Sequence, residues 1–360
     1  MSGLTNNLLD VWEIMLVNSF NHFRAIAIIF IIAGHSFGVN GMTFDTVFNT
    51  TIQNLIAGGT ALFVFISGFL FHHIFYKRYE YKKFMFSKVK NVFTPYFLLG
   101  LIPVIMYTIK KSDAFNGYFL PIESGFISEY LIPFLKYYTS GRFLTAYWYI
   151  PFIMLTFLLS PLHIKYIKLK FNNQLLIITT FSIIALLIHR PVYNINVIQS
   201  VIYFTPIYLI GITASIHKEL IYEYLKGKEV YIILAVILLA TYQSTLGIGG
   251  NYHKDPFTYG GIDLMFFQKI LLCFFFMVFL NRFESNNNKA IHAVASTSFT
   301  AFFIHPFIIF FITKLELGFM AKDSWFLYFA FVLTISATCV LIAKITKKII
   351  PKYSRFIIGY

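Results

Sequence analysis

Charged residues and cysteines are scarce in this chain of 360 residues. Asp, Glu, Lys and Arg together make up only 12% of the sequence. Soluble domains carry about 25% charged residues, so the composition excludes an ordinary soluble fold. The two cysteines, Cys273 and Cys339, fall in different apolar runs. They cannot form a disulfide framework of the kind found in small secreted domains, and we expect small buried thiols instead.

Apolar residues are abundant, at 58% of the chain, with aromatic residues at 20%. This composition is typical of a membrane protein. The net charge of +14 would suit nucleic acid, but the basic residues lie in short loops between apolar runs. Polytopic membrane proteins become basic in this way, so we expect no nucleic-acid partner. No Lys or Arg precedes Arg24, and no small-residue cleavage site follows the first apolar run, so no signal peptide is expected.

Runs of about 16–24 apolar residues, long enough to cross about 30 Å of hydrocarbon, recur along the chain. They predict an all-α fold, in which residues 1–360 form one polytopic membrane bundle of about ten transmembrane helices with no separate soluble domain. Residues 8–20 are too short to span and are expected to form an interfacial pre-helix. The predicted spans are 22–39, 52–76, 91–109, 144–162, 174–189, 196–216, 230–246, 262–280, 291–313 and 326–348.

The distribution of basic residues between alternate loops predicts the orientation. If the N-terminus is cytoplasmic, the loops on the cytoplasmic side carry 19 Lys and Arg and the outer loops carry 8. Cytoplasmic loops of membrane proteins are enriched in these residues, so both termini are expected in the cytoplasm. The longest outer loop, 110–143, is expected to lie over the mouth of the bundle.

Two polar side chains interrupt the first span. Arg24 and His35 are eleven residues apart, about three helical turns, so they project from one face, with His35 about 16 Å deeper. Alone, Arg24 could be an anchor that snorkels to the headgroups, and His35 could pack against a neighbouring helix. Their shared face favours a functional pair that lines the bundle interior or a wet cavity.

Further polar residues occur in two other spans. His305 precedes Pro306 in the ninth span, with Ser298 seven residues earlier on the same face. This pair could equally be helix-packing groups beside a proline kink. In the second span, Ser67 stands next to Gly68, and close helix packing is the favoured interpretation there.

The predicted cytoplasmic loop after the second span is strongly basic. Six cations, among them Lys83, Lys88 and Lys90, alternate with tyrosine and phenylalanine over residues 77–90. Such a segment can anchor the chain on anionic lipid. Cations and aromatic rings at a cytoplasmic mouth also suit a phosphorylated ligand that carries a base. The two roles are compatible.

In order along the chain, five fragments resemble the bacterial integral-membrane acyltransferases called acyltransferase family 3. The fragments are "RAIAIIFIIAGH", similar to its first-helix Arg and His pattern, "FVFISGFLF", "KVKNVFTPY", "YWYIPFIMLTFLLSPL" with Trp148, and "SFTAFFIHP". They cover residues 22 to 310. The resemblance implies transfer of an acyl group, commonly acetyl, from cytoplasmic acyl-CoA to a hydroxyl of an envelope carbohydrate or glycolipid, by a multi-pass protein of the bacterial plasma membrane.

The resemblance also implies roles for particular residues. Arg24 and His35 match the pair regarded as essential in the family, and Lys88 and Lys90 match basic residues thought to face CoA, with Lys83 in the same loop. These lysines stand where arginine is frequent, so bidentate phosphate binding is lost and point-charge contact remains. No Glu of the kind found in many members follows Trp148, which removes a carboxylate partner for the histidine from that helix. Acyl-CoA is expected as a donor substrate, with no permanently bound cofactor and no metal.

These observations suggest a mechanism in which CoA docks on the 77–90 loop, with Arg24 near its phosphates or thioester arm. His35 is then a general base or a transient acyl carrier. Ser67 or His305 is expected to donate to the oxyanion or to orient the acceptor, with Ser298 and Trp148 in support. A transporter or flippase for a lipid-linked sugar or polar solute is the alternative. A lipid-surface interaction protein would explain the basic loop but not two deep histidines. The sequence does not identify the acceptor glycan or the oligomeric state. It also does not show whether the transferred acyl group is acetyl or a larger group such as succinyl.

Overall fold

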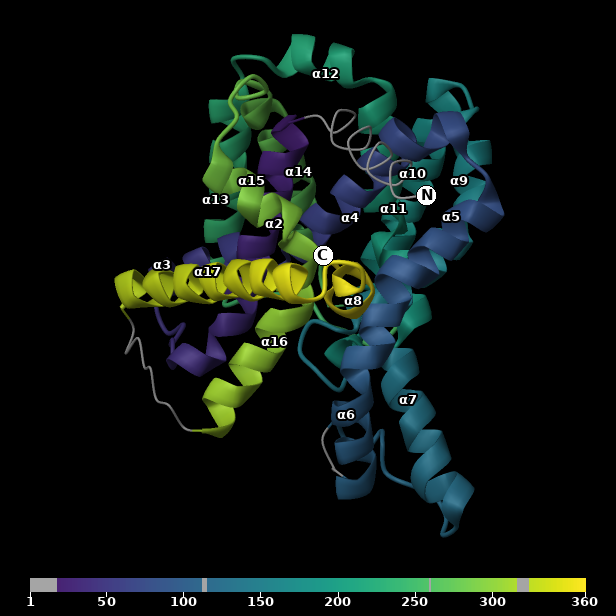
Figure 1. The fold of residues 1–360 in the computed structure, drawn as a ribbon. Helices are drawn as coiled ribbons and strands as arrows, with labels where there is room; N and C mark the ends of the chain where they lie inside the picture. Colours follow the sequence, from purple (N-terminus) through teal and green to yellow (C-terminus); the bar gives the residue numbers. More distant parts are fainter. Residues whose placement is uncertain (1–17, 112–114, 259, 316–323) are drawn as a thin grey trace.

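The computed structural model describes residues 18–111, 115–258, 260–315 and 324–360, drawn in colour in Figure 1. Within these residues the chain is built from helices, and the only extended pairing is an isolated bridge between Arg190 and His253. The predicted all-α class is therefore confirmed. Most of the predicted pre-helix 8–20 lies outside the described residues, and residues 18–20 form the first turn of helix α2.

The helices differ widely in length, because several are interrupted by short 3-10 or π-helical turns. In chain order they are α2 (Asn18–Ser36), α3 (Val47–Ile56), α4 (Thr60–Leu70), α5 (Tyr81–Lys88), α6 (Thr94–Lys110), α7 (Ile132–Ser140), α8 (Tyr149–Leu158), α9 (Ser160–Ile167), α10 (Phe171–Ile188), α11 (Val197–Ile216), α12 (Lys218–Leu225), α13 (Glu229–Thr245), α14 (Leu264–Asn281), α15 (Lys289–Ser296), α16 (Ser298–Lys314), α17 (Trp325–Ile349) and α18 (Ser354–Ile358).

Six of the described helices are long and apolar enough to cross a membrane, or up to eight if each of two bent pairs counts as one span. This confirms a polytopic membrane protein. Helix α13, a shorter apolar helix, matches the predicted span 230–246. Helix α2 matches the first predicted span but is not among the eight, because Asn21, His22 and Arg24 make its first turns polar. The count of ten spans and the cytoplasmic termini stay predictions.

Two predicted spans are bent. The segment predicted as 144–162 begins only at Tyr149 and turns by 57° between α8 and α9. The turn coincides with Pro161, which lacks the N–H that a continuing helix needs. The segment predicted as 291–313 turns by 71° between α15 and α16, at Thr297. The bend at Thr297 places Ser298 at the very start of α16.

Helices α4 and α11 pack backbone to backbone. A Cβ atom added at Gly68 would lie 2.1 Å from the carbonyl oxygen of Tyr208, and one added at Gly211 would lie 2.2 Å from that of Phe65. Only glycine permits so close an approach. The packing role predicted for Gly68 is therefore confirmed.

A turn separates α3 from α4. Gly58 lies in this turn with a φ of +77°, a left-handed conformation that favours glycine. The turn leaves the last carbonyls of α3 without helical partners. Lys269 of α14 supplies the missing hydrogen-bond donor. Its Nζ donates to the carbonyl oxygens of Asn54 (3.0 Å) and Leu55 (2.8 Å).

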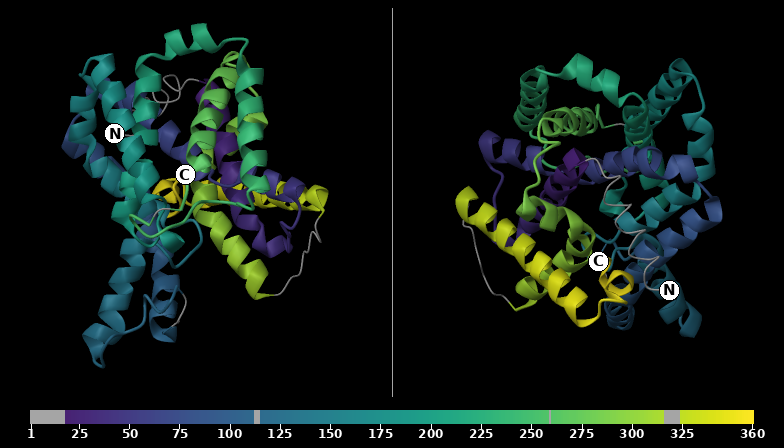
Figure 2. Two further views of the ribbon diagram at one scale, coloured as in Figure 1. Left: turned by 180° about the vertical axis from the view of Figure 1, so that it is seen from behind. Right: turned by 45° about the horizontal axis from the view of Figure 1, so that its top comes forward.

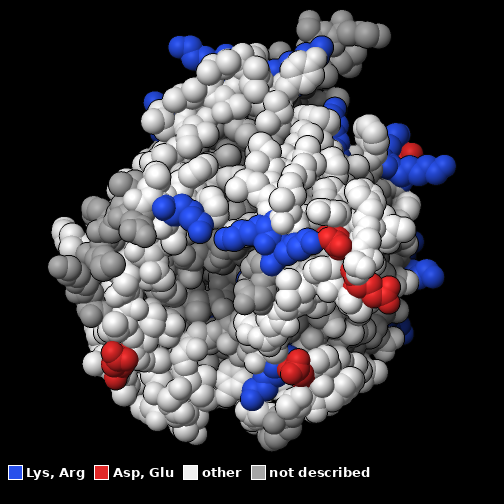
Figure 3. All heavy atoms as spheres, turned by 90° about the horizontal axis from the view of Figure 1, so that it is seen from below, with Lys and Arg blue, Asp and Glu red and all other residues white. Residues whose placement is uncertain are grey.

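Several connections between helices gather at two opposite ends of the molecule (Figures 1 and 2). Helix α12, the α9–α10 connection and the turn between α14 and α15 lie at one end, and the far ends of α6 and α7 lie at the other. The connections at the first end belong to loops predicted as cytoplasmic and those at the second end to a loop predicted as outer, whereas the C-terminus, also predicted as cytoplasmic, lies near the middle of the molecule (Figure 1). Helix α17 runs across the molecule, at a steep angle to α6. From the α6–α7 end, Figure 3 shows few charged side chains on a largely uncharged surface.

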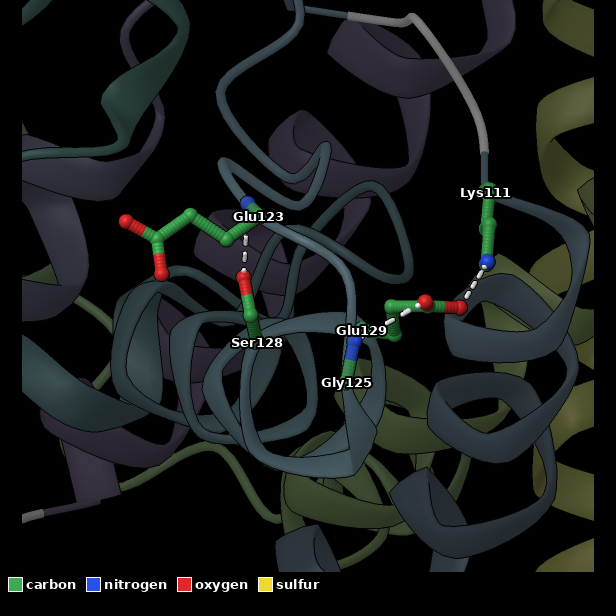
Figure 4. Close-up of polar contacts among 5 residues, drawn as sticks. All are labelled: Lys111, Glu123, Gly125, Ser128 and Glu129. Carbon is green, nitrogen blue, oxygen red and sulfur yellow. Dashed lines mark hydrogen bonds and ion pairs between the residues drawn. The ribbon is translucent and has the colours of Figure 1, made fainter.

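The loop predicted to cover the bundle mouth instead joins a projecting arm, formed by α6 and α7 (Figures 1 and 2). At its tip Lys111 forms an ion pair with Glu129, and the N–H of Gly125 donates to the other carboxylate oxygen (3.1 Å; Figure 4). The backbone N–H of Glu123 donates to the Ser128 hydroxyl (3.1 Å). The hydrogen bond from Lys111, and then that from Gly125, lowers the pKa of Glu129.

Candidate functional site

The two deep histidines meet inside the bundle. The rings of His35 on α2 and His305 on α16 stack with 5.6 Å between their centroids and 25° between their planes. His305 Nδ1 lies 2.7 Å from the carbonyl oxygen of Ala301. Because a carbonyl only accepts, Nδ1 carries the proton and Nε2 the lone pair. That Nε2 is buried and has no hydrogen-bond partner among the described residues.

His35 is held by the segment that precedes α8. Its Nδ1 lies 2.9 Å from the hydroxyl of Thr145, which is within hydrogen-bonding distance. A hydrogen bond at one ring nitrogen fixes the orientation of the imidazole and decides what the other nitrogen can do. Because α8 starts late, at Tyr149, the residues before it are free to turn toward His35.

Two arginines that sequence analysis did not select lie within electrostatic range of His35. Arg142 comes from the segment before α8 and has a buried Nε without a partner among the described residues. Arg190 comes from the tight turn between α10 and α11. Its guanidinium lies 4.7 Å from the ring of Trp148, and its Nε donates to Asn194 Oδ1 (2.8 Å). Trp148, predicted in a supporting role, therefore positions Arg190.

At the other end of α2, Arg24 turns toward α16. Its Nη2 donates to the hydroxyl of Ser298 (3.1 Å), which is almost fully buried. Sequence spacing predicts one polar face on α2, with Arg24 and His35, and one on α16, with Ser298 and His305. These two faces lie opposite each other. Helices α2 and α16 bring these four residues together as two pairs.

Lys88 lies in a cage of aromatic rings. Its Nζ is 4.4 Å from the ring centroid of Phe75, 5.0 Å from that of Phe84 and 4.7 Å from that of Phe157. Aromatic faces attract a cation and hold it in place. The cage is flanked by two π-helical turns, Phe71–Phe75 and Val89–Phe93. Such turns often occur at functional sites.

A third cation joins Arg24 and Lys88. Arg355 is within electrostatic range of both. It lies on α18, which packs against α6, α16 and the Val89–Phe93 turn. None of the ion pairs found among the described residues includes Arg24, Lys88 or Arg355. We call these three residues the basic cluster.

The other predicted residues are placed differently. Lys83 is exposed and pairs with Glu80 (2.7 Å), and Lys90 is also exposed. Neither Lys83 nor Lys90 has a described contact with the basic cluster.

Ser67, predicted as a possible donor to the oxyanion, is hydrogen-bonded to the hydroxyl of Tyr149 on α8, and has no described contact with His35. Within the described residues, no group of three His, Cys, Asp or Glu side chains is arranged to hold a metal ion.

Sequence analysis missed Thr145, Arg142, Arg190 and Arg355. Arg190 carried a sequence signal, since it is a cation inside the shortest predicted outer turn, "HRPVYNIN". Arg355 was counted only as a positive charge after the last span. Thr145 and Arg142 lie in a segment predicted partly as helix, so nothing indicated that they turn toward His35.

Comparison with known proteins identifies the family. A family model described as an acyltransferase domain, that of acyltransferase family 3, matches residues 17–344. Two relatives, from Staphylococcus aureus strains MW2 and N315, are each named as a probable poly-beta-1,6-N-acetyl-D-glucosamine export protein. Each is 22% identical over 276 residues, which cover 72% of this chain and 71% of the relative. No solved structure matches. The chain belongs to acyltransferase family 3 and is a multi-pass membrane acyltransferase.

Proposed function

We propose that this protein moves an acyl group, acetyl in the simplest case, from cytoplasmic acyl-CoA to a hydroxyl of a cell-envelope carbohydrate or glycolipid in the bacterial plasma membrane. One observation carries the proposal. Helix α2 carries Arg24, a member of the basic cluster, and also His35 deeper in the bundle, and α16 contacts both residues. Helix α2 therefore connects an end suited to binding an anion with an imidazole inside the protein.

The basic cluster suits the phosphates of CoA. The Arg355 guanidinium lies within electrostatic range of both the Arg24 guanidinium and the Lys88 ammonium, and none of the three forms an ion pair with the described carboxylates. Guanidinium groups bind phosphate oxygens in a bidentate way, and an ammonium group adds a compact point charge. The Phe75, Phe84 and Phe157 rings hold the Lys88 ammonium in place for this role. The uncharged pantetheine arm can then extend along α2 toward His35.

The contact between His35 and Thr145 supports a general-base role. When His35 Nδ1–H donates to the Thr145 hydroxyl, Nε2 keeps its lone pair and can accept a proton from the acceptor hydroxyl. The acceptor oxygen then attacks the thioester carbonyl, the carbon–sulfur bond breaks, and the proton passes to the CoA thiolate. Arg142, with its unpartnered Nε, is placed to stabilise the negative charge on the carbonyl oxygen. A transient acyl-His35 is the alternative chemical route.

The test uses membrane vesicles that contain the protein, with acetyl-CoA labelled in the acetyl group. We expect label in a carbohydrate or lipid-linked sugar for the wild-type protein. For His35→Ala we expect a rate lower by about 10²- to 10⁴-fold, the usual contribution of a general base. Lys83→Gln serves as the control, because Lys83 is exposed and paired with Glu80. Full transfer by a folded His35→Ala protein would contradict the role of His35.

A second candidate, transport of a lipid-linked sugar or polysaccharide, is favoured by the name of the relatives, which describes export. In that case His35, His305 and the arginines would line a path for the sugar. Transport of a fluorescent lipid-linked sugar across proteoliposomes that lack CoA, with no transfer of label, would favour this second function. Transfer of label that requires acetyl-CoA favours the acyltransferase.

A further inference from the structure

A small pocket lies between α4, α11 and α14. Its polar lining consists of Arg190, Tyr203, Asn251 and Lys269, and the rest of its wall is mainly apolar. Arg190 reaches it from the turn before α11, and Asn251 from the loop after α13. Both segments are predicted to lie on the outer side. The basic cluster, by contrast, includes Lys88 of the loop predicted as cytoplasmic.

Two cations line this pocket and both are nearly buried. Arg190 is 6% exposed and Lys269 is 2% exposed. Burial lowers the pKa of Arg190 to about 10, so the guanidinium stays charged at neutral pH. Neither residue forms an ion pair with the described carboxylates. The described hydrogen bonds of Lys269 go to two carbonyl oxygens, which leaves its third N–H for another acceptor.

The nearest carboxylate is already engaged. Asp263 lies within electrostatic range of Arg190, but one of its oxygens accepts from the Tyr203 hydroxyl (2.7 Å) and the other from the N–H of Phe266 (3.0 Å). Asp263 thereby caps the start of α14. The buried Arg190 guanidinium therefore has one carboxylate within range, and that carboxylate is held by other donors, while Lys269 adds a second basic side chain to the same pocket. Buried charges without full compensation are costly, and inside a membrane they usually mark a ligand site.

The geometry points to a site for an oxyanion group in this pocket. We propose that it binds a carboxylate or phosphate carried by one of the two reactants, between the Arg190 guanidinium on one side and the Lys269 ammonium and Asn251 amide on the other. Arg190 is also within electrostatic range of His35, so the same guanidinium contacts the pocket and influences the imidazole. The inference that the anion is part of a reactant rests on the proposed transfer function, whereas the inference that the pocket binds an anion does not depend on that function.

The residues around the two cations keep them in place. Trp148 and Phe204 lie under the Arg190 guanidinium, at 4.7 Å and 5.7 Å from the ring centroids. Gly58 leaves room for Lys269, because a Cβ atom there would come within 2.9 Å of Lys269 Cε and 3.4 Å of Asn251 Oδ1. The pocket is therefore held in shape by packing and by backbone conformation.

Trp148 gives a direct readout of binding. The chain has three tryptophans, so a protein with Trp12→Phe and Trp325→Phe reports from Trp148 alone. This protein, purified in lipid nanodiscs, is titrated with succinate, with inorganic phosphate and with neutral succinamide at constant ionic strength. We expect a saturable change in Trp148 emission with at least one of the two anions and none with succinamide. An unchanged emission with both anions would overturn the proposal, and this comparison needs no variant in the pocket.

Variants then locate the binding. We expect Arg190→Gln to weaken the anion response at least 10-fold, Arg190→Lys to weaken it less, and Lys111→Gln to leave it unchanged. Lys111 is the matched control because it is a cation paired with Glu129 on the projecting arm (Figure 4). An equal anion response in Arg190→Gln would place the binding elsewhere and overturn the proposal.

The source of the anion is found by transfer assays in vesicles, with labelled acetyl-CoA and labelled succinyl-CoA. If the anion belongs to the acyl group, Arg190→Gln lowers succinyl transfer at least 10-fold more than acetyl transfer. If it belongs to the acceptor, both transfers fall together. Absence of any transfer by the wild-type protein would refute the proposed function, whereas a Trp148 response that persists would still support the pocket. The two failures are therefore distinguishable.

Discussion

His35 and His305 stack inside the bundle, with 5.6 Å between their ring centroids, although they lie near opposite ends of the chain. The same two helices, α2 and α16, are also joined by the hydrogen bond from Arg24 to Ser298. Two polar contacts therefore fix how these helices face each other.

Thr145 is expected to position His35. Thr145→Val keeps the shape of the side chain but removes the hydroxyl that bonds Nδ1. We expect the rate constant of transfer to fall by about 10-fold or more, with little change in the apparent KM for acetyl-CoA, because only the orientation of the base is lost. Thr145→Ser should restore most of the rate. Steady-state kinetics in vesicles measure both values, and an unchanged rate in Thr145→Val would argue against this role.

Arg355 is expected to contribute to donor binding. Because it lies in the basic cluster, Arg355→Gln should raise the apparent KM for acetyl-CoA by about 10-fold, which corresponds to about 1.4 kcal/mol. The rate at saturation should change little. Lys83→Gln is the matched control, since Lys83 is exposed and paired with Glu80. The prediction is wrong if the two variants show the same KM.

Ser298 is expected to hold Arg24 in place. Ser298→Ala removes the oxygen that accepts from Arg24 Nη2. Hydrogen bonds to charged groups contribute about 1.5–3 kcal/mol, so the KM for acetyl-CoA should rise by roughly 10-fold or more. A melting temperature close to that of the wild-type protein, measured in the same detergent, would show that the loss is not one of folding. A normal KM would indicate that Arg24 needs no such support.

The glycines between α4 and α11 are expected to be essential for folding. A methyl group at Gly211 would overlap the carbonyl oxygen of Phe65, and a backbone atom cannot rotate away. Overpacking typically costs about 1–3 kcal/mol and sometimes more, so Gly211→Ala should lower the melting temperature clearly or prevent folding. Gly34→Ala is the control, because no atom lies within 4 Å of the added carbon. Equal thermal stability of the two variants would contradict the close packing.

The sequence predicted the fold class and most of the membrane helices, because apolar length and composition are local properties. It also predicted that Arg24 shares a face with His35 and that Ser298 shares one with His305, since helical spacing fixes both. It did not predict the bends before Ser160 and before Ser298. Pro161 coincides with the first bend, but proline is also tolerated in the first turn of a helix, and Thr297 and Ser298 are compatible with a continuous helix as well as with a break, so packing decides.

The residues that surround His35 could not be predicted for a related reason. Thr145, Arg142 and Arg190 come from connections whose path depends on contacts with distant helices. The isolated bridge between Arg190 and His253 and the positive φ of His189 (59°) fix one of these paths. Such features leave no periodic pattern in the sequence. Arg355 likewise depends on the short helix α18 packing against α6.

The turn between α3 and α4 affects the order in which the protein can assemble. Its two open carbonyl groups receive their partner from Lys269, 214 and 215 residues later in the chain. Until α14 is synthesised, these two carbonyl groups of the second predicted span lack the side-chain partner that they have in the folded protein, and unsatisfied carbonyl groups are costly in a membrane. The part of the chain inserted before α14 therefore lacks the hydrogen bonds from Lys269. Ribosome-bound chains that end before Lys269 should be more sensitive to membrane quality-control proteases than chains that include it.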